Sequence, residues 1–150
     1  MKIKPENAAC AIIIDKKNNF ILQKRDNKKN IFFPNHWGLF GGAKNKNEKY
    51  INTIKREINE ELGFVPKKIS FFINLKFDMK ILINKEINRY CYICTVEDLK
   101  KMKIVLNEGK KYKIFSKSEI KKFILQKNLI APYDYLTIWL FLNKNKLIRH

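Results

Sequence analysis

The chain has 150 residues, the length of one domain that can bury a core of its own. Hydrophobic residues make up 45% and aromatic residues 13% of the sequence, which excludes an intrinsically disordered chain. The longest apolar runs, Ala8–Ile14 and Tyr135–Leu142, are far shorter than the roughly 20 residues that span a bilayer. We therefore expect one domain over residues 1–150, in the cytoplasm and without a membrane segment.

Basic residues outnumber acidic residues by 32 to 14, so the formal net charge is +18. A charge of this size attracts polyanions, and nucleic acid is one interpretation of the partner. The lysines are scattered over the whole length, however, which is typical of a solvated Lys-rich surface. Nucleic acid stays open as a partner but is not favoured.

The first elements follow from β-branched apolar runs and the polar turns between them. They are predicted strands over Ala8–Ile14 and Phe20–Lys24, a charged loop over Arg25–Asn35, and a short strand over Trp37–Phe40 that leads into Gly41 and Gly42. The first two strands are close enough in sequence to form a hairpin.

The clearest helix is predicted over Tyr50–Leu62. Its aliphatic residues form one stripe at 100° per residue, at Ile51, Ile54, Ile58 and Leu62. Gly63 supplies a C-terminal stop, and Pro66 prevents any continuation.

The second half of the chain predicts three more strands and two helices. The strands are Ile69–Phe77, Ile87–Val96 and a shorter one over Tyr112–Phe115; the helices run from Ser116 through Phe123 and from Pro132 to about Leu142. Strands mixed with a few helices indicate an α+β fold in which helices sandwich a β-sheet.

The cysteines carry little chemistry. Cys91 and Cys94 spell CxxC, but they lie in a predicted strand, where odd spacing sends the two thiols to opposite faces. That arrangement is wrong for two ligands of one zinc ion. We expect both side chains, and Cys10, to be small buried hydrophobic groups.

Three glutamates crowd onto the Tyr50–Leu62 helix. Glu57, Glu60 and Glu61 are spaced i, i+3 and i+4, so they lie within one 100° arc, where like charges repel. Glu57 and Glu61 flank the apolar stripe, whereas a merely solvated acidic face would lie opposite the core. Clustered carboxylates at the rim of a cleft are what a hard divalent cation requires.

The glycine pair before this helix fits the same chemistry. Gly41 and Gly42 end a predicted strand where the backbone comes close to another group or takes unusual angles. A carbonyl there could add an oxygen ligand, and the amides of the following turn and helix N-terminus could bind phosphate oxygens. Together these features predict metal-assisted phosphoryl chemistry.

The segment Gly42–Phe64 resembles the Nudix box, a glycine followed at fixed distances by Glu, Arg-Glu-aliphatic-x-Glu-Glu-x-Gly and an aliphatic residue. The matching residues are Gly42, Glu48, Arg56, Glu57, Ile58, Glu60, Glu61 and Gly63, with Phe64 in place of the usual aliphatic residue. Upstream, the run from Trp37 to Gly42 resembles the WxLPGG entry of many Nudix proteins, with Phe40 in place of Pro. Asn45 and Asn47 replace a glutamate and a glycine common in the family, which puts the shape of this loop in question.

The resemblance implies a mixed sheet between helices and a Mg²⁺ site, at which Mn²⁺ could substitute. Glu57 and Glu61 would be the chief ligands, with Glu60 assisting and the carbonyl of Gly41 as a further ligand. Arg56 would orient the glutamates. Glu48 meets Arg56 only if the loop folds back, because eight helical residues span about 12 Å.

The general base and the substrate contacts are less determined. Some Nudix enzymes take the base from the box, here Glu60, and others from a later loop, where Glu108 resembles that position or is an ordinary turn residue. Trp37 could stack on a base or pack beside the glycine pair. Gly42 is the other candidate substrate contact.

The implied activity is hydrolysis of the diphosphate link of a nucleoside diphosphate derivative, first a small nucleotide such as a (d)NTP, oxidised or not, or a nucleotide sugar. Hydrolysis of RNA 5′ ends and a non-catalytic nucleotide-binding regulator are the alternatives. Substrate contacts would come from the loops Arg25–Asn35 and Asp78–Asn88. A homodimer is common in the family and stays open for this chain.

Overall fold

The computed structural model describes residues 4–78, 80, 84–126 and 129–147. In chain order the elements are β1 (Ala8–Asp15), β2 (Phe20–Lys24), β3 (Trp37–Gly38), β4 (Phe40–Ala43), α1 (Tyr50–Leu62), β5 (Lys68–Asp78), β6 (Glu86–Val96), β7 (Lys111–Phe115), α3 (Lys117–Ile124) and α4 (Pro132–Leu147). Among these described helices, none is long and apolar enough to cross a membrane.

The strands form one seven-stranded sheet with the order β3-β2-β1-β6-β5, in which β4 also pairs with β1 and β7 with β2. The central pair β1 and β6 is parallel, with Cys10 opposite Cys91, and the other pairs are antiparallel. The sheet is therefore mixed, and the predicted α+β class is confirmed.

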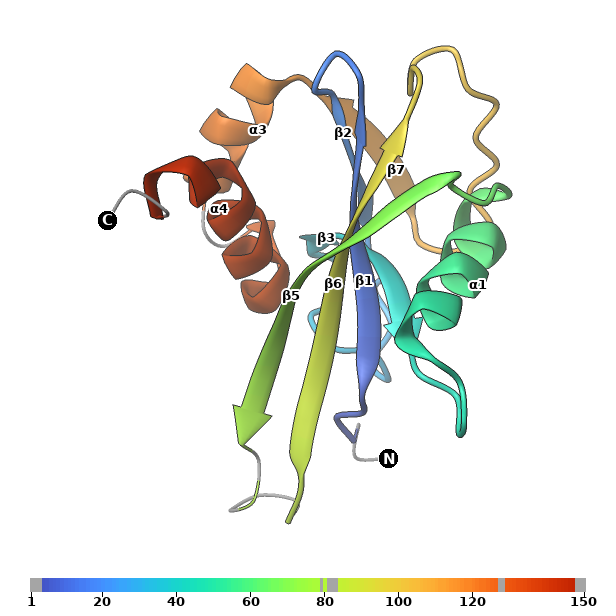
Figure 1. Ribbon diagram of the computed structural model, residues 1–150, viewed down its shortest axis with the longest axis vertical. Coiled ribbons are helices and arrows are strands. Elements are labelled where there is room, and N and C mark those ends of the chain that lie inside the picture. Colours follow the sequence, from blue (N-terminus) through green and yellow to red (C-terminus); the bar gives the residue numbers. More distant parts are fainter. Residues whose placement is uncertain (1–3, 79, 81–83, 127–128, 148–150) are drawn as a thin grey trace.

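Helices cover both faces of the sheet: α1 lies on one side, and α3 and α4 lie on the other (Figure 1). Each face has its own core cluster. The cluster under α3 and α4 includes Cys10, Ile12, Phe20, Leu22, Trp37, Leu39, Cys91, Phe115, Ile120 and Ile138. The cluster under α1 includes Ala9, Ala11, Ile13, Phe40, Ile54, Ile58, Leu62, Tyr92, Cys94 and Leu99.

The alternation along β1 and β6 explains this division. Successive side chains of a strand point to opposite faces, and a central strand covered on both sides is apolar throughout. Cys91 and Cys94 accordingly lie in different clusters, and both are buried free thiols. The predicted opposite orientation of these two side chains is confirmed.

The structure corrects two of the predicted boundaries. The single strand predicted over Trp37–Phe40 is wrong, because the chain changes partner at Leu39: β3 pairs with β2, whereas β4 pairs with β1. The last helix continues beyond Leu142 to Leu147. The prediction ended too early because the residues after Leu142 are mostly polar, so the apolar pattern stops there while the helix does not. The remaining strands and α1 agree with the prediction to within about two residues.

The two loops predicted to contact substrate are only partly comparable with the structure. The segment 25–35 contains neither helix nor strand, as expected. Of the predicted loop Asp78–Asn88, residues 79 and 81–83 lie outside the described part of the chain. Its ends belong to β5, which includes Asp78, and to β6, which begins at Glu86.

Candidate active site

Glu61 lies on the buried face of α1, with 4% of its surface exposed. Its carboxylate accepts hydrogen bonds from Gln23 Nε2 of β2 at 3.0 Å and from the Gly41 amide of β4 at 2.8 Å. Burial raises the pKa of Glu61 to about 8; the two hydrogen bonds oppose the rise, and the nearby Glu57 and Glu108 add to it. A cation bound beside this buried carboxyl group would stabilise its charged form.

Glu57 lies one helical turn before Glu61 and beside the glycine pair. A Cβ atom on Gly42 would stand 2.5 to 2.7 Å from the Glu57 carboxylate, so glycine is required for this approach. Burial raises the pKa of Glu57 as well, against the effect of an ion pair with Arg56 Nη1 at 2.6 Å. Two carboxylates with raised pKa values thus lie next to Gly41 and Gly42.

Arg56 is the centre of the polar network on α1. Its Nε and Nη2 donate to the two oxygens of Glu48 at 3.0 and 3.1 Å, and Nη2 also donates to the Ala43 carbonyl at 3.1 Å. Its Nη1 donates to Glu57 and, at 3.1 Å, to Glu60. The loop therefore does fold back, and Arg56 contacts Glu48, Glu57 and Glu60.

Glu60 differs from its two neighbours on the helix. Its side chain is 52% exposed, and it forms an ion pair with Arg56 Nη1 at 3.1 Å. The side chain points out of the buried face that holds Glu61. Of the three clustered glutamates, Glu60 is therefore the least enclosed.

The loop before β7 is fastened to the C-terminal end of α1. The amide of Asn107 donates to the Glu61 carbonyl at 2.9 Å, and its Nδ2 donates to the Glu60 carbonyl at 2.9 Å. The Val105 amide donates to the Leu62 carbonyl at 3.3 Å. These bonds satisfy carbonyls that a helix end leaves without partners, and they hold Glu108 beside Glu61.

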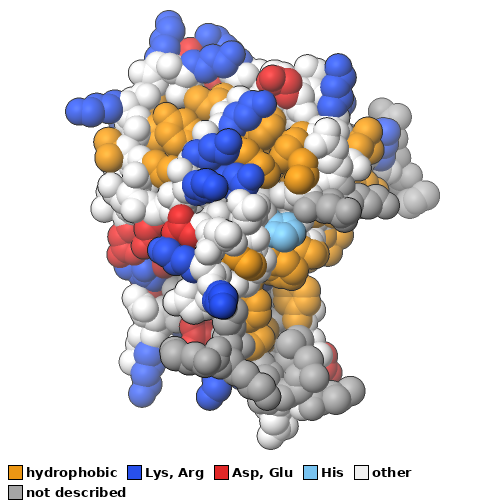
Figure 2. Space-filling model, turned by 180° about the vertical axis from the view of Figure 1, so that it is seen from behind, with side chains coloured by type: hydrophobic (Ala, Val, Ile, Leu, Met, Phe, Trp, Pro, Cys, Tyr) orange, Lys and Arg blue, Asp and Glu red, His pale blue; other side chains and the backbone are white. Residues whose placement is uncertain are grey.

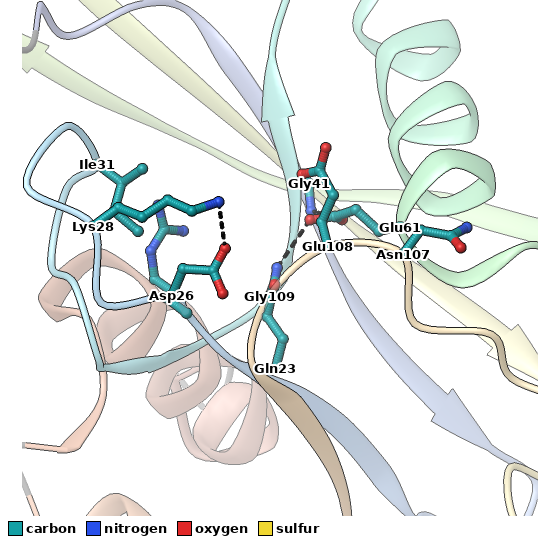
Figure 3. A pocket seen from close by; sticks show the side chains of 10 residues that line it. Gln23, Asp26, Lys28, Ile31, Gly41, Glu61, Asn107, Glu108 and Gly109 are labelled. Carbon is teal, nitrogen blue, oxygen red and sulfur yellow. Dashed lines mark hydrogen bonds and ion pairs between the residues drawn. The ribbon is translucent and has the colours of Figure 1, made fainter.

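Glu61 and Glu108 face a polar cavity of about 470 Å³, called here the glutamate cavity. Its lining comes from β2, the 25–36 loop, β4, α1 and the loop before β7, and consists of Gln23, Arg25, Asp26, Lys28, Ile31, Gly41, Glu61, Asn107, Glu108 and Gly109. In Figure 3, Glu61 and Glu108 converge near Gly41, with Lys28 across the cavity. Acidic and basic side chains thus face one another across this cavity.

A second cavity of about 490 Å³, the apolar cavity, adjoins the first. Its lining includes Phe32, Phe33, Gly42, Phe77, Ile87, Arg89 and Tyr133. Arg25, Ile31 and Gly41 line both cavities. A polar compartment that adjoins a largely apolar one suits a ligand with a charged end and an aromatic end.

Comparison with known proteins agrees with this geometry. A model of the NUDIX domain matches residues 4–139. An 8-oxo-dGTP diphosphatase of Buchnera aphidicola subsp. Schizaphis graminum is 31% identical over 134 residues, which cover 89% of this chain and 92% of that protein. The chain belongs to the Nudix family.

Solved Nudix structures share the fold. The MutT protein of Methanosarcina mazei Go1 has a TM-score of 0.71 at 23% identity, covering 97% of this chain and 99% of that one. The NUDIX domain of Shewanella oneidensis NrtR, complexed with ADP ribose, has a TM-score of 0.69 at 16% identity, covering 98% and 90%. The protein is a Nudix-type hydrolase.

Nudix hydrolases generally use divalent metals, and the donor groups here fit such an ion. In the part of the chain that the structure describes, no three Cys, His, Asp or Glu side chains converge as a complete metal cluster. Mg²⁺ does not need one, because it usually binds through one or two carboxylates, with waters and substrate phosphates completing its shell. Glu57 and Glu61 can supply two hard oxygen donors beside Gly41 and Gly42, and burial raises the pKa of both carboxyls.

Trp37 lies in the core cluster under α3 and α4 rather than beside Glu57 and Glu61. It is 9% exposed and packs edge-to-face on Phe115 and Phe123, with ring centroids 5.9 Å apart in both pairs. Trp37 was predicted either to stack on a nucleobase or to pack in the protein, and the position of its ring agrees with packing. Gly42, the other candidate contact, lines the apolar cavity.

On the face of the protein that Figure 2 shows, several Lys and Arg side chains lie side by side across the upper half, and others lie singly elsewhere. The largest group of acidic side chains on that face lies at one edge. Basic residues that are scattered along the sequence thus lie partly together on this face.

Four residues that line the candidate site or hold its loop were not singled out from the sequence: Gln23, Arg25, Lys28 and Asn107. Arg25 and Lys28 do lie in the loop Arg25–Asn35, which was predicted as a whole to contact substrate. Gln23 could have been noticed as a polar residue inside the apolar run of β2, where it is 4% exposed. The other three lie in loops, and only the fold brings them to the glutamates.

Proposed function

We propose that this Nudix hydrolase is a Mg²⁺-dependent pyrophosphohydrolase that cleaves the diphosphate link of a small nucleotide, a (d)NTP before a nucleotide sugar. The observation that carries the proposal is the position of buried Glu61, which lies beside Glu108 at a polar cavity that adjoins an apolar one. The diphosphate would lie in the glutamate cavity and the nucleoside in the apolar cavity.

The residues shared by the two cavities support this placement. Arg25 lines both, so its guanidinium could bind a phosphate at the junction between nucleoside and diphosphate. Lys28 of the same loop lines the glutamate cavity and is 65% exposed, although it pairs with Asp26 at 2.8 Å. Both cations would offset the negative charge that the substrate brings to the glutamates.

Glu57 and Glu61 would hold the metal, with the Gly41 carbonyl as a further ligand. When bound, Mg²⁺ would lower the pKa of the attacking water and neutralise charge on the phosphates. Arg56 would act as a positioning residue, because its bonds to Glu48 and the Ala43 carbonyl fix the guanidinium that orients Glu57.

Two residues compete for the role of general base. Glu108 lines the glutamate cavity beside Glu61, so its carboxylate could accept a proton from the attacking water. Glu60 is half exposed and is tied to Arg56. The position of Glu108 favours it over Glu60.

The comparisons suggest which substrates to try first. A relative at 31% identity is named an 8-oxo-dGTP diphosphatase, and a structural neighbour is complexed with ADP ribose. We therefore infer that activity should be tested on a panel of candidate substrates, which contains (d)NTPs, oxidised dGTP, ADP-ribose, nucleotide sugars and a 5′-triphosphate RNA.

The test measures phosphate and pyrophosphate release from this panel with and without Mg²⁺. Glu61→Gln should reduce metal-dependent turnover on the order of 10³-fold, since several kcal/mol of charge stabilisation depend on the metal. Glu86→Gln, an exposed glutamate of β6, is the matched control and should keep full activity. Equal activity of Glu61→Gln and the unchanged protein would defeat the proposal.

The same panel separates the alternatives. Preference for the RNA, with activity that falls steeply as salt is added, would favour an RNA 5′-end hydrolase. Binding of a nucleotide without turnover of any panel member would favour a regulatory module. The +18 charge motivates the RNA arm, but its scatter over the sequence keeps small nucleotides first.

A further inference from the structure

Arg89 is a nearly enclosed cation at the wall of the apolar cavity. It lies on β6, its side chain is 15% exposed, and the cavity wall around it includes Phe33, Phe77, Ile87 and Tyr133. A guanidinium stays charged under physiological conditions and carries five N–H donors. A charge held in apolar surroundings is costly unless its donors are used.

The protein holds this guanidinium on two sides. Arg89 Nη2 donates to Asp134 Oδ1 at 2.7 Å, and Asp134 is fully buried. The guanidinium carbon lies 4.3 Å from the ring centroid of Tyr133, a cation–π contact. Asp134 is itself fixed, because its Oδ2 accepts the Leu39 amide at 3.1 Å.

Most donors of Arg89 nevertheless have no partner among the residues that the structure describes. Within the described residues, the bond to Asp134 is the one hydrogen bond that the Arg89 side chain donates, and its Nε is a buried donor with no partner. Buried donors of this kind are rare in native proteins, and each needs an explanation. An acceptor brought by a ligand of the apolar cavity would provide one.

We propose that Arg89 is a specificity-determining residue that recognises the acceptor edge of a nucleobase in the apolar cavity and thereby selects 6-oxopurines over adenine. The inference rests on the proposed function for the placement of the nucleoside. The Arg89 guanidinium would discriminate between the bases, and its contacts with Asp134 and Tyr133 fix its position.

The chemistry of the bases gives the direction of the selection. Guanine presents two adjacent acceptors, O6 and N7, which match the planar fork of an arginine. Adenine presents a donor, its 6-amino group, beside N7, so one contact becomes donor against donor. Phe33 packs edge-to-face on Tyr133 at 5.4 Å, which keeps the aromatic wall that would contact the flat base in place.

The test compares kcat/KM for four nucleotides: dGTP, dITP, dATP and 7-deaza-dGTP. dITP keeps O6 and N7 but lacks the 2-amino group, and 7-deaza-dGTP lacks the N7 acceptor alone. We expect dGTP and dITP to exceed dATP by about 5- to 150-fold, the discrimination of a good bidentate contact, and 7-deaza-dGTP to lie between them.

The test variant must remove the N–H donors of Arg89 without leaving the Asp134 carboxylate buried and unpaired. Arg89→Met alone leaves Asp134 buried without its cation, which strongly destabilises a fold. The double variant Arg89→Met/Asp134→Asn removes both charges, and the Asn carbonyl can still accept the Leu39 amide. This variant should turn over all four nucleotides at similar rates, whereas Lys121→Met on the exposed face of α3 should keep the preference.

Binding of dGMP and dAMP in metal-free buffer, measured by calorimetry, gives a readout that does not depend on turnover. Failure to hydrolyse any nucleotide would defeat the proposed function, while a dGMP preference lost in the double variant would still support the role of Arg89. Equal binding and turnover of guanine and adenine nucleotides by the unchanged protein would overturn it. So would a folded double variant that keeps the preference.

Discussion

Glu48 and Arg56 form a two-point ion pair across eight residues of sequence, with Nε to Oε1 at 3.0 Å and Nη2 to Oε2 at 3.1 Å. Glu48 also accepts the Asn45 amide and the Thr53 hydroxyl, so both its oxygens are bonded. The loop before α1 thus returns onto the first turns of the helix. Its carboxylate holds Arg56, and Arg56 holds Glu57.

The first prediction concerns Glu48→Gln and acid stability. The hydrogen bonds from Arg56 lower the pKa of Glu48 to about 2, against 4.5 for an ordinary glutamate. A carboxyl with a lowered folded pKa contributes stability that is present above about pH 4.5 and is lost as the pH falls towards about 2. Glu48→Gln should therefore be less stable than the unchanged protein at pH 6, and the difference should shrink on acidification.

Urea unfolding at several pH values between 6 and about 3 measures that difference. Glu86→Gln, whose exposed side chain pairs with a lysine at the surface, should follow the unchanged protein throughout. A Glu48→Gln stability difference that is constant over this range would show that the ion pair does not set the pKa of Glu48.

The second prediction separates the two glycines of β4. Gly41 has φ 137°, and a Cβ there would collide with the Ala9 carbonyl oxygen on β1. Gly41→Ala should cost about 3 kcal/mol or more of folding free energy, because strain and a backbone clash add. The three atoms nearest to a Cβ on Gly42 all belong to the flexible Glu57 carboxylate, so Gly42→Ala should fold with a smaller loss of stability and yet lose metal-dependent turnover.

Thermal unfolding and turnover, measured on the same samples, check both variants. The expected pattern is a large drop in Tm for Gly41→Ala and a small drop for Gly42→Ala, with low activity in both. Full activity in Gly42→Ala would mean that the position of Glu57 beside this glycine does not matter for the reaction.

Local sequence patterns predicted the fold class and the orientation of the glutamates on α1, because helical periodicity is a short-range property. Ile54, Ile58 and Leu62 are fully buried, as their stripe indicated. The same geometry placed Glu61 at the flank of that stripe, and the structure has it more enclosed, at 4% exposed. The difference arises because Gln23 and Gly41 cover the carboxylate from the sheet, which a helical wheel does not include.

The rest of the site depends on contacts that no local pattern reports. Asn107 reaches the Glu60 carbonyl across 47 residues of sequence, and Gln23 reaches Glu61 across 38. Arg89 and Asp134 meet across 45 residues. These pairs form because α1 and α4 pack on the sheet that contains β2 and β6, and because the loop before β7 meets the end of α1. The pairs therefore follow from the topology and not from the spacing of residues.

The third prediction tests the loop that carries Glu108. Glu108→Gln should lower kcat by about 10²- to 10⁴-fold with little change in stability, as expected for a general base. Asn107→Ala removes the bond to the Glu60 carbonyl, so it should cost about 1 kcal/mol of stability and lower kcat by about 10-fold through misplacement of Glu108. Steady-state kinetics and urea unfolding measure the two effects.

Asn143→Ala is the matched control for the loop, because Asn143 Nδ2 also donates to a backbone carbonyl, that of Trp139, at 2.9 Å. It should show a similar or smaller stability loss and no kinetic effect. An unchanged kcat in Glu108→Gln would assign the base to another group, with Glu60 the next candidate.

The last prediction concerns Glu61, metal and pH. In the metal-free protein burial raises the pKa of Glu61 to about 8, so the folded state holds a proton that the unfolded chain releases near pH 4.5. The free energy of unfolding therefore falls as the pH rises from about 4.5 towards about 8, and Glu61→Gln should lack this fall.

A divalent ion binds the carboxylate and not the carboxylic acid, so it displaces that proton. Mg²⁺ should accordingly stabilise the unchanged protein more at pH 8 than at pH 6, and Glu61→Gln little at either. Urea unfolding in EDTA and in Mg²⁺ measures all four cases, and the same pH dependence in both proteins would rule out Glu61 as the residue that links protons to the metal.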